Sequence, residues 1–132
     1  MFDAKTKILV VDDMAMMRKA VTKFCQGFGF TDLTEAVDGV DAWTKISEAK
    51  PPFELVISDW NMPNCTGIDL LKRIRADGRF GKTPVLMVTA EKEKEQILEA
   101  VKAGVSGYVV KPFTPDVLKE KLEAMHAKLK TA

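Results

Sequence analysis

Five charged or hydroxyl side chains stand at the ends of short apolar runs in this 132-residue chain. They are Asp12 and Asp13 after KILVV, Asp59 after FELVIS, Thr89 in LMVT and Lys111 after GYVV. A single aspartate at the end of a strand is usually a turn former or a helix cap. Three carboxylates gathered with an ammonium group and a hydroxyl are instead a set that binds a cation and a phosphoryl group. A carboxylate within such a set is a plausible nucleophile for an aspartyl phosphate.

The three carboxylates also predict the kind of cation. Crowded carboxylates repel one another, and one or more take up a proton unless a cation lies between them. An all-oxygen site favours Mg²⁺ or Ca²⁺ over softer metals. The spacing of the aspartates lacks the acidic loop of an EF-hand, and Mg²⁺ typically combines a few carboxylates with waters and a phosphate oxygen. We therefore predict Mg²⁺ as the cofactor.

Two hydrophobic patterns alternate along the chain and must position these side chains. The short β-rich runs lie at residues 7–11, 33–37, 53–58, 83–89 and 107–110. Longer segments between them have helical spacing, and the first has an apolar face made of Met14, Met17, Val21, Phe24 and Phe28. Thr114 is expected to cap a last helix whose first residue is Pro115, where no N–H is needed.

This alternation predicts an α/β fold: a single (βα)5 domain with a doubly wound, parallel, five-stranded sheet covered by helices on both faces. Ligands bind such a sheet beyond the carboxyl ends of its strands. The five side chains are therefore expected to project into one crevice. With no linker or internal repeat in the sequence, we expect one domain over residues 1–132 and no output domain.

The composition excludes several classes of protein. Lys and Arg (20) nearly balance Asp and Glu (19), so net charge gives no reason to expect nucleic acid or a membrane surface as a partner. No apolar run is long enough for a signal peptide or a transmembrane helix. The two cysteines are too few for a disulfide framework or a zinc site. We expect a cytoplasmic monomer without nucleic-acid binding or membrane insertion.

Four segments in order, LVVDD, ISDWNMPN, LMVTAE and GYVVKPF, resemble the bacterial two-component receiver domain. Within that family the chain is most similar to the stand-alone chemotaxis response regulators. The resemblance runs from the first strand to the last helix. It implies the flavodoxin-like strand order 2-1-3-4-5.

The resemblance implies a role for each residue at the strand ends. Asp59 would be the phosphoacceptor. Asp13 and Asp59 would bind Mg²⁺ directly, together with the backbone carbonyl of Asn61, and Asp12 would act mainly through a bound water. Lys111 would pair with Asp59 and then with the phosphoryl group.

It also implies a switch. Thr89 would hydrogen-bond a phosphoryl oxygen, with the N–H of Ala90 nearby, and Tyr108 would turn inward as Thr89 moves. Asn61 and Glu91 would tune the lifetime of the phosphate.

The readout surface implied by the resemblance is the face of the fourth helix, fifth strand and fifth helix, which binds the flagellar motor switch protein in this family. Here that face would include Lys92, Ile97, Tyr108 and Lys121. For Ile97 the alternative is a core position. Among the tryptophans, Trp60 is expected to be partly exposed and Trp43 packed. The Lys111–Pro112 bond is expected to be cis.

The chain departs from the family after the phosphoacceptor. Receivers commonly carry Met-Asp before the glycine of this loop, and this chain has Cys65 and Thr66. We interpret Cys65 as an incidental loop thiol, with a redox role as the alternative. Cys25 is expected in the core, and His126 as neither phosphoacceptor nor ligand.

The implied function is a phosphorylation-activated response regulator of bacterial chemotaxis, a signalling switch that catalyses only its own phosphotransfer and autodephosphorylation. It would take a phosphoryl group from a sensor histidine kinase and then bind the flagellar motor switch, and a dedicated phosphatase would be a further partner. The open alternative is a phosphate sink or relay intermediate without a motor target. A haloacid-dehalogenase-type phosphatase is rejected, because Asn61 stands where that class has its second aspartate.

Overall fold

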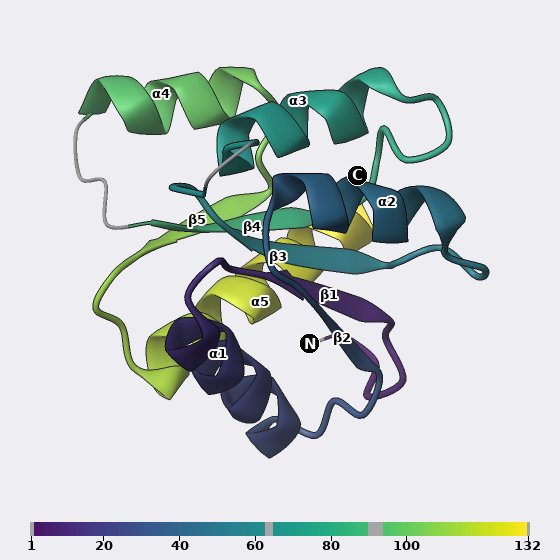
Figure 1. The fold of residues 1–132 in the computed structure, drawn as a ribbon. Helices are drawn as coiled ribbons and strands as arrows, with labels where there is room; N and C mark the ends of the chain where they lie inside the picture. Colours follow the sequence, from purple (N-terminus) through teal and green to yellow (C-terminus); the bar gives the residue numbers. More distant parts are fainter. Residues whose placement is uncertain (1, 63–64, 90–93, 132) are drawn as a thin grey trace.

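The computed structural model describes residues 2–62, 65–89 and 94–131 (Figure 1). Its strands are β1 (Ile8–Val11), β2 (Leu33–Ala36), β3 (Leu55–Asp59), β4 (Val85–Thr89) and β5 (Gly107–Val110). Its helices are α1 (Ala15–Gly27), α2 (Gly39–Glu48), α3 (Gly67–Ala76), α4 (Lys94–Lys102) and α5 (Pro115–Thr131). None of the helices in these ranges is long and apolar enough to cross a lipid bilayer.

The strands form one parallel sheet in the order β2-β1-β3-β4-β5, so the predicted α/β fold and strand order are confirmed. The chain passes outward from β1 to β2 and then returns to β3 on the other side of β1. This reversal opens a crevice beyond the ends of β1 and β3. The register pairs Val11 with Ser58, which brings Asp12, the residue after β1, beside Asp59.

The helices form a layer on each face of the sheet (Figure 1). Helices α2, α3 and α4 lie over one face, and α1 and α5 lie over the other. Alternate residues of β1 join different apolar clusters: Leu9 and Val11 pack with the first layer, and Ile8 and Val10 with the second. All four are at most 1% exposed, which explains why this strand is a continuous apolar run rather than an alternating one.

Side-chain caps mark where α2, α3 and α5 begin. Asp38 caps α2, accepting from the N–H of Asp41 (2.7 Å). The hydroxyl of Thr114 accepts a hydrogen bond from the N–H of Val117 (3.3 Å), which confirms the predicted start of α5. Thr66 caps α3 in the same way, accepting from the N–H of Asp69 (3.2 Å).

Trp60 is only 7% exposed, so the prediction of a partly exposed side chain was wrong. The N–H of Gly67 donates to the carbonyl of Trp60 (2.8 Å), and the start of α3 therefore lies directly over the end of β3. The Trp60 ring is covered within the apolar cluster of the first layer. The predicted packing of Trp43 is confirmed, since its ring meets that of Phe80 edge-on at 6.2 Å between centroids.

The inward face of α1 is centred further along the helix than the sequence predicts. Its buried residues are Val21 and Cys25, whereas Met14 precedes the helix and is 58% exposed. Cys25 is a core residue as predicted, and burial raises the pKa of its thiol to about 12.

Candidate functional site

Three aspartates meet where β1 and β3 end. One carboxylate oxygen from each of Asp12, Asp13 and Asp59 lies within 4.8 Å of the others. Asp12 and Asp59 are 3% and 6% exposed, and Asp13 is exposed. Two of the three negative charges are therefore held away from water at short range.

Asp59 is held through one of its two oxygens. Its Oδ1 accepts a hydrogen bond from its neighbour's backbone, the N–H of Trp60 (2.9 Å), and another from Nζ of Lys111 (3.1 Å). All the hydrogen bonds that this carboxylate makes with described residues reach Oδ1. Among the described residues, none donates a hydrogen bond to the other oxygen, Oδ2.

The environment of Asp59 raises the pKa of its carboxyl group. Burial is the main cause, and the negative charge of Asp12 adds to it. The charge and hydrogen bond of Lys111, with the N–H of Trp60, oppose the rise. The site thus carries a destabilised negative charge that a second cation would relieve.

Within the part of the chain that the structure describes, Lys111 is the cation that lies against the buried carboxylates of Asp12 and Asp59. Its Nζ lies 3.1 Å from Asp59 and 3.6 Å from Oδ2 of Asp12, and its side chain is 17% exposed. The backbone N–H of Lys111 donates to the carbonyl of Thr89 (2.7 Å), which ties the end of β5 to the end of β4. The Lys111–Pro112 bond is cis as predicted, and the Lys50–Pro51 bond, about which no prediction was made, is also cis.

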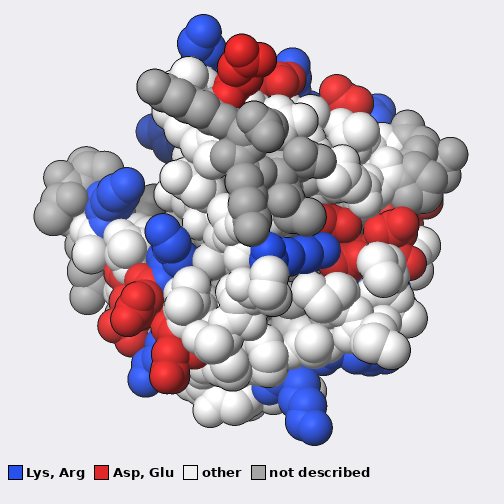
Figure 2. All heavy atoms as spheres, turned by 90° about the vertical axis from the view of Figure 1, so that its left-hand side faces the viewer, with Lys and Arg blue, Asp and Glu red and all other residues white. Residues whose placement is uncertain are grey.

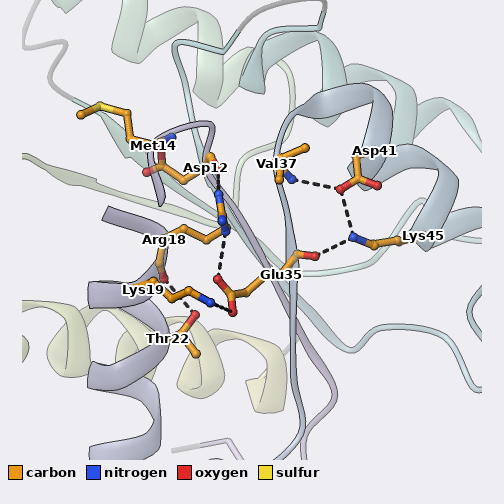
Figure 3. Close-up of polar contacts among 9 residues, drawn as sticks. All are labelled: Asp12, Met14, Arg18, Lys19, Thr22, Glu35, Val37, Asp41 and Lys45. Carbon is orange, nitrogen blue, oxygen red and sulfur yellow. Dashed lines mark hydrogen bonds and ion pairs between the residues drawn. The ribbon is translucent and has the colours of Figure 1, made fainter. Parts of the chain in front are cut away.

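Asp12 is anchored by both its backbone and its side chain. Its N–H donates to the carbonyl of Ala36 on β2 (3.2 Å). Its Oδ1 accepts from the N–H of Met14 (2.9 Å), at the entry to α1 (Figure 3). Its Oδ2 faces Lys111.

An open pocket of about 400 Å³ lies over the aspartates, lined by Asp13, Met14, Met17, Asp59, Asn61 and Lys111. Figure 2 looks onto this edge of the sheet and shows basic atoms beside acidic ones near its centre. Met14 and Met17 were assigned to the apolar face of a helix and not to the pocket. Met14 directly follows Asp12 and Asp13 in the sequence, and this position could have predicted that it lies beside them in the pocket.

The predicted switch residues are described only in part. Thr89 is the last residue of β4 and is 1% exposed. Tyr108 lies on β5, paired with Met87, and is half-buried. Ala90 lies outside the described residues, as do Glu91, predicted to tune the phosphate lifetime, and Lys92, predicted to bind the partner.

The structure brings together two of the predicted partner-binding residues. Nζ of Lys121 on α5 lies 5.5 Å from the centre of the Tyr108 ring, a cation–π contact. Ile97 on α4 is half-buried, between the surface and core positions considered for it, and Leu98 beside it is 46% exposed.

The unusual Cys65 and Thr66 contribute to structure at the start of α3 and against α2. Thr66 is the cap of α3. Cys65 packs so closely on Gly39 that a Cβ added at that glycine would lie 2.7 Å from its Sγ. Burial, and then the charge of Asp69, raise the pKa of the Cys65 thiol. Both effects oppose thiolate formation, in line with the interpretation of an incidental thiol.

The donor set fits Mg²⁺. It consists of carboxylate oxygens close enough to share one ion, and the carboxylate with the raised pKa is among them. Hard divalent cations prefer such oxygens. Asp13 and Asp59 both line the pocket, as does Asn61, whose carbonyl was predicted as a further ligand.

Comparisons with known proteins agree with this geometry. A family model described as "Response regulator receiver domain" matches residues 8–123. The chain is 52% identical over 117 residues to chemotaxis protein CheY of Pseudomonas aeruginosa, covering 89% of this chain and 93% of that protein. It is 48% identical over 119 residues to CheY1 of Helicobacter pylori strain J99, covering 90% and 95%.

The solved structure of chemotaxis response regulator CheY4 of Vibrio cholerae superimposes with a TM-score of 0.83 at 36% identity, covering 92% of this chain and 98% of that one. The strand order, the acidic crevice and the family match lead to one assignment. The chain belongs to the response regulator receiver domain family and is a CheY-like chemotaxis receiver domain.

Proposed function

We propose that this protein is a phosphorylation-activated chemotaxis regulator that accepts a phosphoryl group on Asp59 from a sensor histidine kinase. The observation that carries the proposal is the environment of the Asp59 carboxylate. Its carboxylate is buried at the end of β3, held by Lys111 through Oδ1, and grouped with two further carboxylates.

Oδ2 of Asp59 is the nucleophile, because the hydrogen bonds made with described residues all engage Oδ1. Oδ2 attacks the phosphorus of a phosphohistidine. The new bond joins Oδ2 to phosphorus as the nitrogen–phosphorus bond breaks. The imidazole leaves with that bond's electron pair and takes a proton from solvent.

Lys111 is already against Asp59 and Asp12, so its ammonium group faces the incoming phosphoryl oxygens without a large rearrangement. Asp12, Asp13, Asp59 and the carbonyl of Asn61 would hold Mg²⁺. When bound, the ion supplies positive charge that offsets repulsion between the carboxylates and the phosphoryl group.

The consequence of phosphorylation is binding to the flagellar motor switch. Two relatives that share about half of their residues with this chain are chemotaxis proteins by name. Thr89 and Tyr108 lie at the end of β4 and on the adjacent β5, where a new phosphoryl group is sensed and relayed to the surface that carries Lys121.

Incubation with a small phosphodonor such as acetyl phosphate tests the phosphoacceptor. Intact-mass spectrometry should show one Mg²⁺-dependent phosphoryl group on the wild type and none on Asp59→Asn. A stable, Mg²⁺-dependent phosphate on Asp59→Asn would place the acceptor elsewhere.

Binding to a peptide from a flagellar switch protein of the same source tests the output. The titration is done with Mg²⁺ alone and then with beryllofluoride, which mimics the phosphoryl group. Tighter binding with beryllofluoride supports motor output. Activation without a gain in peptide affinity supports the phosphate-sink alternative.

A further inference from the structure

Arg18 of α1 reaches back to the turn that carries the aspartates (Figure 3). Its Nη1 donates to the backbone carbonyl of Asp12 (2.9 Å), and its Nε donates to Glu35 on β2 (2.9 Å). The Arg18 side chain is only 12% exposed. A guanidinium held at two points and largely shielded from water has a fixed direction.

Glu35 is itself held in place. Its carboxylate also accepts from Lys19 (3.0 Å), and Nζ of Lys45 donates to its backbone carbonyl (2.7 Å). The pKa of Glu35 is lowered, first by the hydrogen bond from Lys19 and also by that from Arg18, against the opposing effect of burial. Glu35 is therefore a charged and fixed acceptor for Arg18.

The described residues give Asp13 no comparable support. Its carboxylate makes no hydrogen bond or ion pair with another described residue, although it lies in the acidic cluster and lines the pocket. Its position therefore depends on its backbone. The Asp12 carbonyl belongs to the planar peptide unit that leads directly to the Cα of Asp13.

Among the described residues, three contacts fix this peptide unit and the units on either side of it. The N–H of Asp12 is tied to Ala36, and the Asp12 carboxylate accepts from the N–H of Met14. The carbonyl is tied to Arg18. Without that third contact the peptide unit between Asp12 and Asp13 is free to tilt, and Asp13 tilts with it.

We propose that Arg18 is a positioning residue which, braced by Glu35, aims the Asp13 carboxylate into the acidic cluster and so sets its affinity for Mg²⁺. This inference rests on the proposed Mg²⁺-dependent function and adds to it a residue that touches none of the reacting groups. Partners behind the ligands of a metal site commonly govern its affinity.

If Arg18 acted only through its charge, its removal would change Mg²⁺ affinity in the opposite direction. Arg18 carries a positive charge near an acidic site, so its removal should strengthen the binding of a cation if charge alone decided. Arg18→Lys keeps the charge and loses the two-point geometry. The two explanations therefore predict different results for the same variants.

The test measures Mg²⁺ affinity by isothermal titration calorimetry for wild type, Arg18→Lys, Arg18→Gln and a matched control, Lys19→Gln. Lys19 is 67% exposed, contacts the same Glu35, and makes no contact with Asp12. We expect both Arg18 variants to bind Mg²⁺ about tenfold more weakly. Lys19→Gln should bind as wild type does, or slightly more tightly, because Glu35 keeps its hydrogen bonds with Arg18 and Lys45.

Unfolding by urea in EDTA and in Mg²⁺ separates positioning from stability. The Mg²⁺-induced increase in stability should shrink in the Arg18 variants and persist in Lys19→Gln. Arg18 variants that are less stable in EDTA but keep the full Mg²⁺ increment overturn the inference and leave the proposed function standing. Failure of the wild type itself to bind Mg²⁺ overturns both.

Discussion

Asp59 lies in surroundings that favour its protonated form: it is buried, and Asp12 stands beside it. Its folded pKa is raised above that of the unfolded chain, so the group favours folding at low pH and opposes it once ionised. The ionised, reactive form of Asp59 therefore lowers the stability of the fold.

Asp59→Asn should therefore stabilise the metal-free protein at neutral pH by about 1 kcal/mol, since the amide keeps an oxygen for the N–H of Trp60 and removes the charge. As the pH rises through the folded pKa, wild type should lose stability relative to the variant. Urea unfolding in EDTA at a series of pH values measures this. Asp32→Asn, at an exposed aspartate before β2, is the control. A variant less stable than wild type across the range would contradict the argument.

Lys111 compensates the same charges and allows a second prediction. Lys111→Ala leaves the buried carboxylates of Asp12 and Asp59 without their cation. We expect a loss of about 3 kcal/mol in the free energy of unfolding in EDTA. The loss should be smaller in Mg²⁺, because the ion takes over the compensation.

Urea unfolding with and without Mg²⁺ makes the comparison, with Lys119→Ala at an exposed position on α5 as the matched control. Equal losses in the two conditions would mean that Lys111 and the ion compensate different groups.

The residues that face one another across the site were largely predictable. Asp12, Asp13, Asp59 and Lys111 each follow a buried apolar run, and parallel strands bring their carboxyl ends to one edge. The burial of Trp60 was not predictable in this way. It depends on how closely α3 returns over β3, which local patterns do not determine.

At the scale of elements, β3 and α3 meet closely at Gly67. A Cβ added at Gly67 would collide with the carbonyl oxygen of Asp59 and would lie 2.8 Å from Sδ of Met87 and 2.9 Å from Cα of Trp60. Two of these neighbours are backbone atoms, which cannot move without shifting the end of β3. The first residue of α3 therefore helps to set the position of the phosphoacceptor.

Gly67→Ala should lower the free energy of unfolding by about 1–3 kcal/mol and weaken Mg²⁺ binding as well, because the overpacked contact displaces Asp59. Gly27→Ala is the matched control: it lies at the end of α1, and an added Cβ meets nothing within 4 Å. The control should keep its stability or gain about 0.5–1 kcal/mol. Chemical denaturation and calorimetry check both effects. Normal Mg²⁺ affinity in Gly67→Ala would show that the start of α3 does not set the position of Asp59.

The elements themselves were well predicted, because the strands covered on both faces are apolar throughout. The ion pair between Arg18 of α1 and Glu35 of β2 was not predicted. Arg18 and Glu35 are seventeen positions apart, and neither differs from an ordinary surface charge by its sequence context. Their pairing follows from the placement of α1 beside β2, which exists only once the sheet has formed.

For the molecule as a whole, the acidic crevice predicts a link between metal and stability. At a Mg²⁺ concentration one hundred times the dissociation constant, the folded protein should gain about 2.7 kcal/mol relative to EDTA. Asp13→Asn should lose most of this gain and little stability in EDTA, because the Asp13 side chain is exposed. Thermal unfolding across a Mg²⁺ series measures both. If Asp13→Asn keeps the full Mg²⁺-induced gain in stability, the ion does not bind at the three aspartates.

The sheet also divides the interior into two. Among the described residues, the cluster beneath α2, α3 and α4 shares no buried side chain with the cluster beneath α1 and α5. Changes of volume in one cluster reach the other only through the strand backbones, so their energies should simply add. Each half of the core is then free to diverge by itself, and compensating substitutions in related sequences should be found on the same side of the sheet.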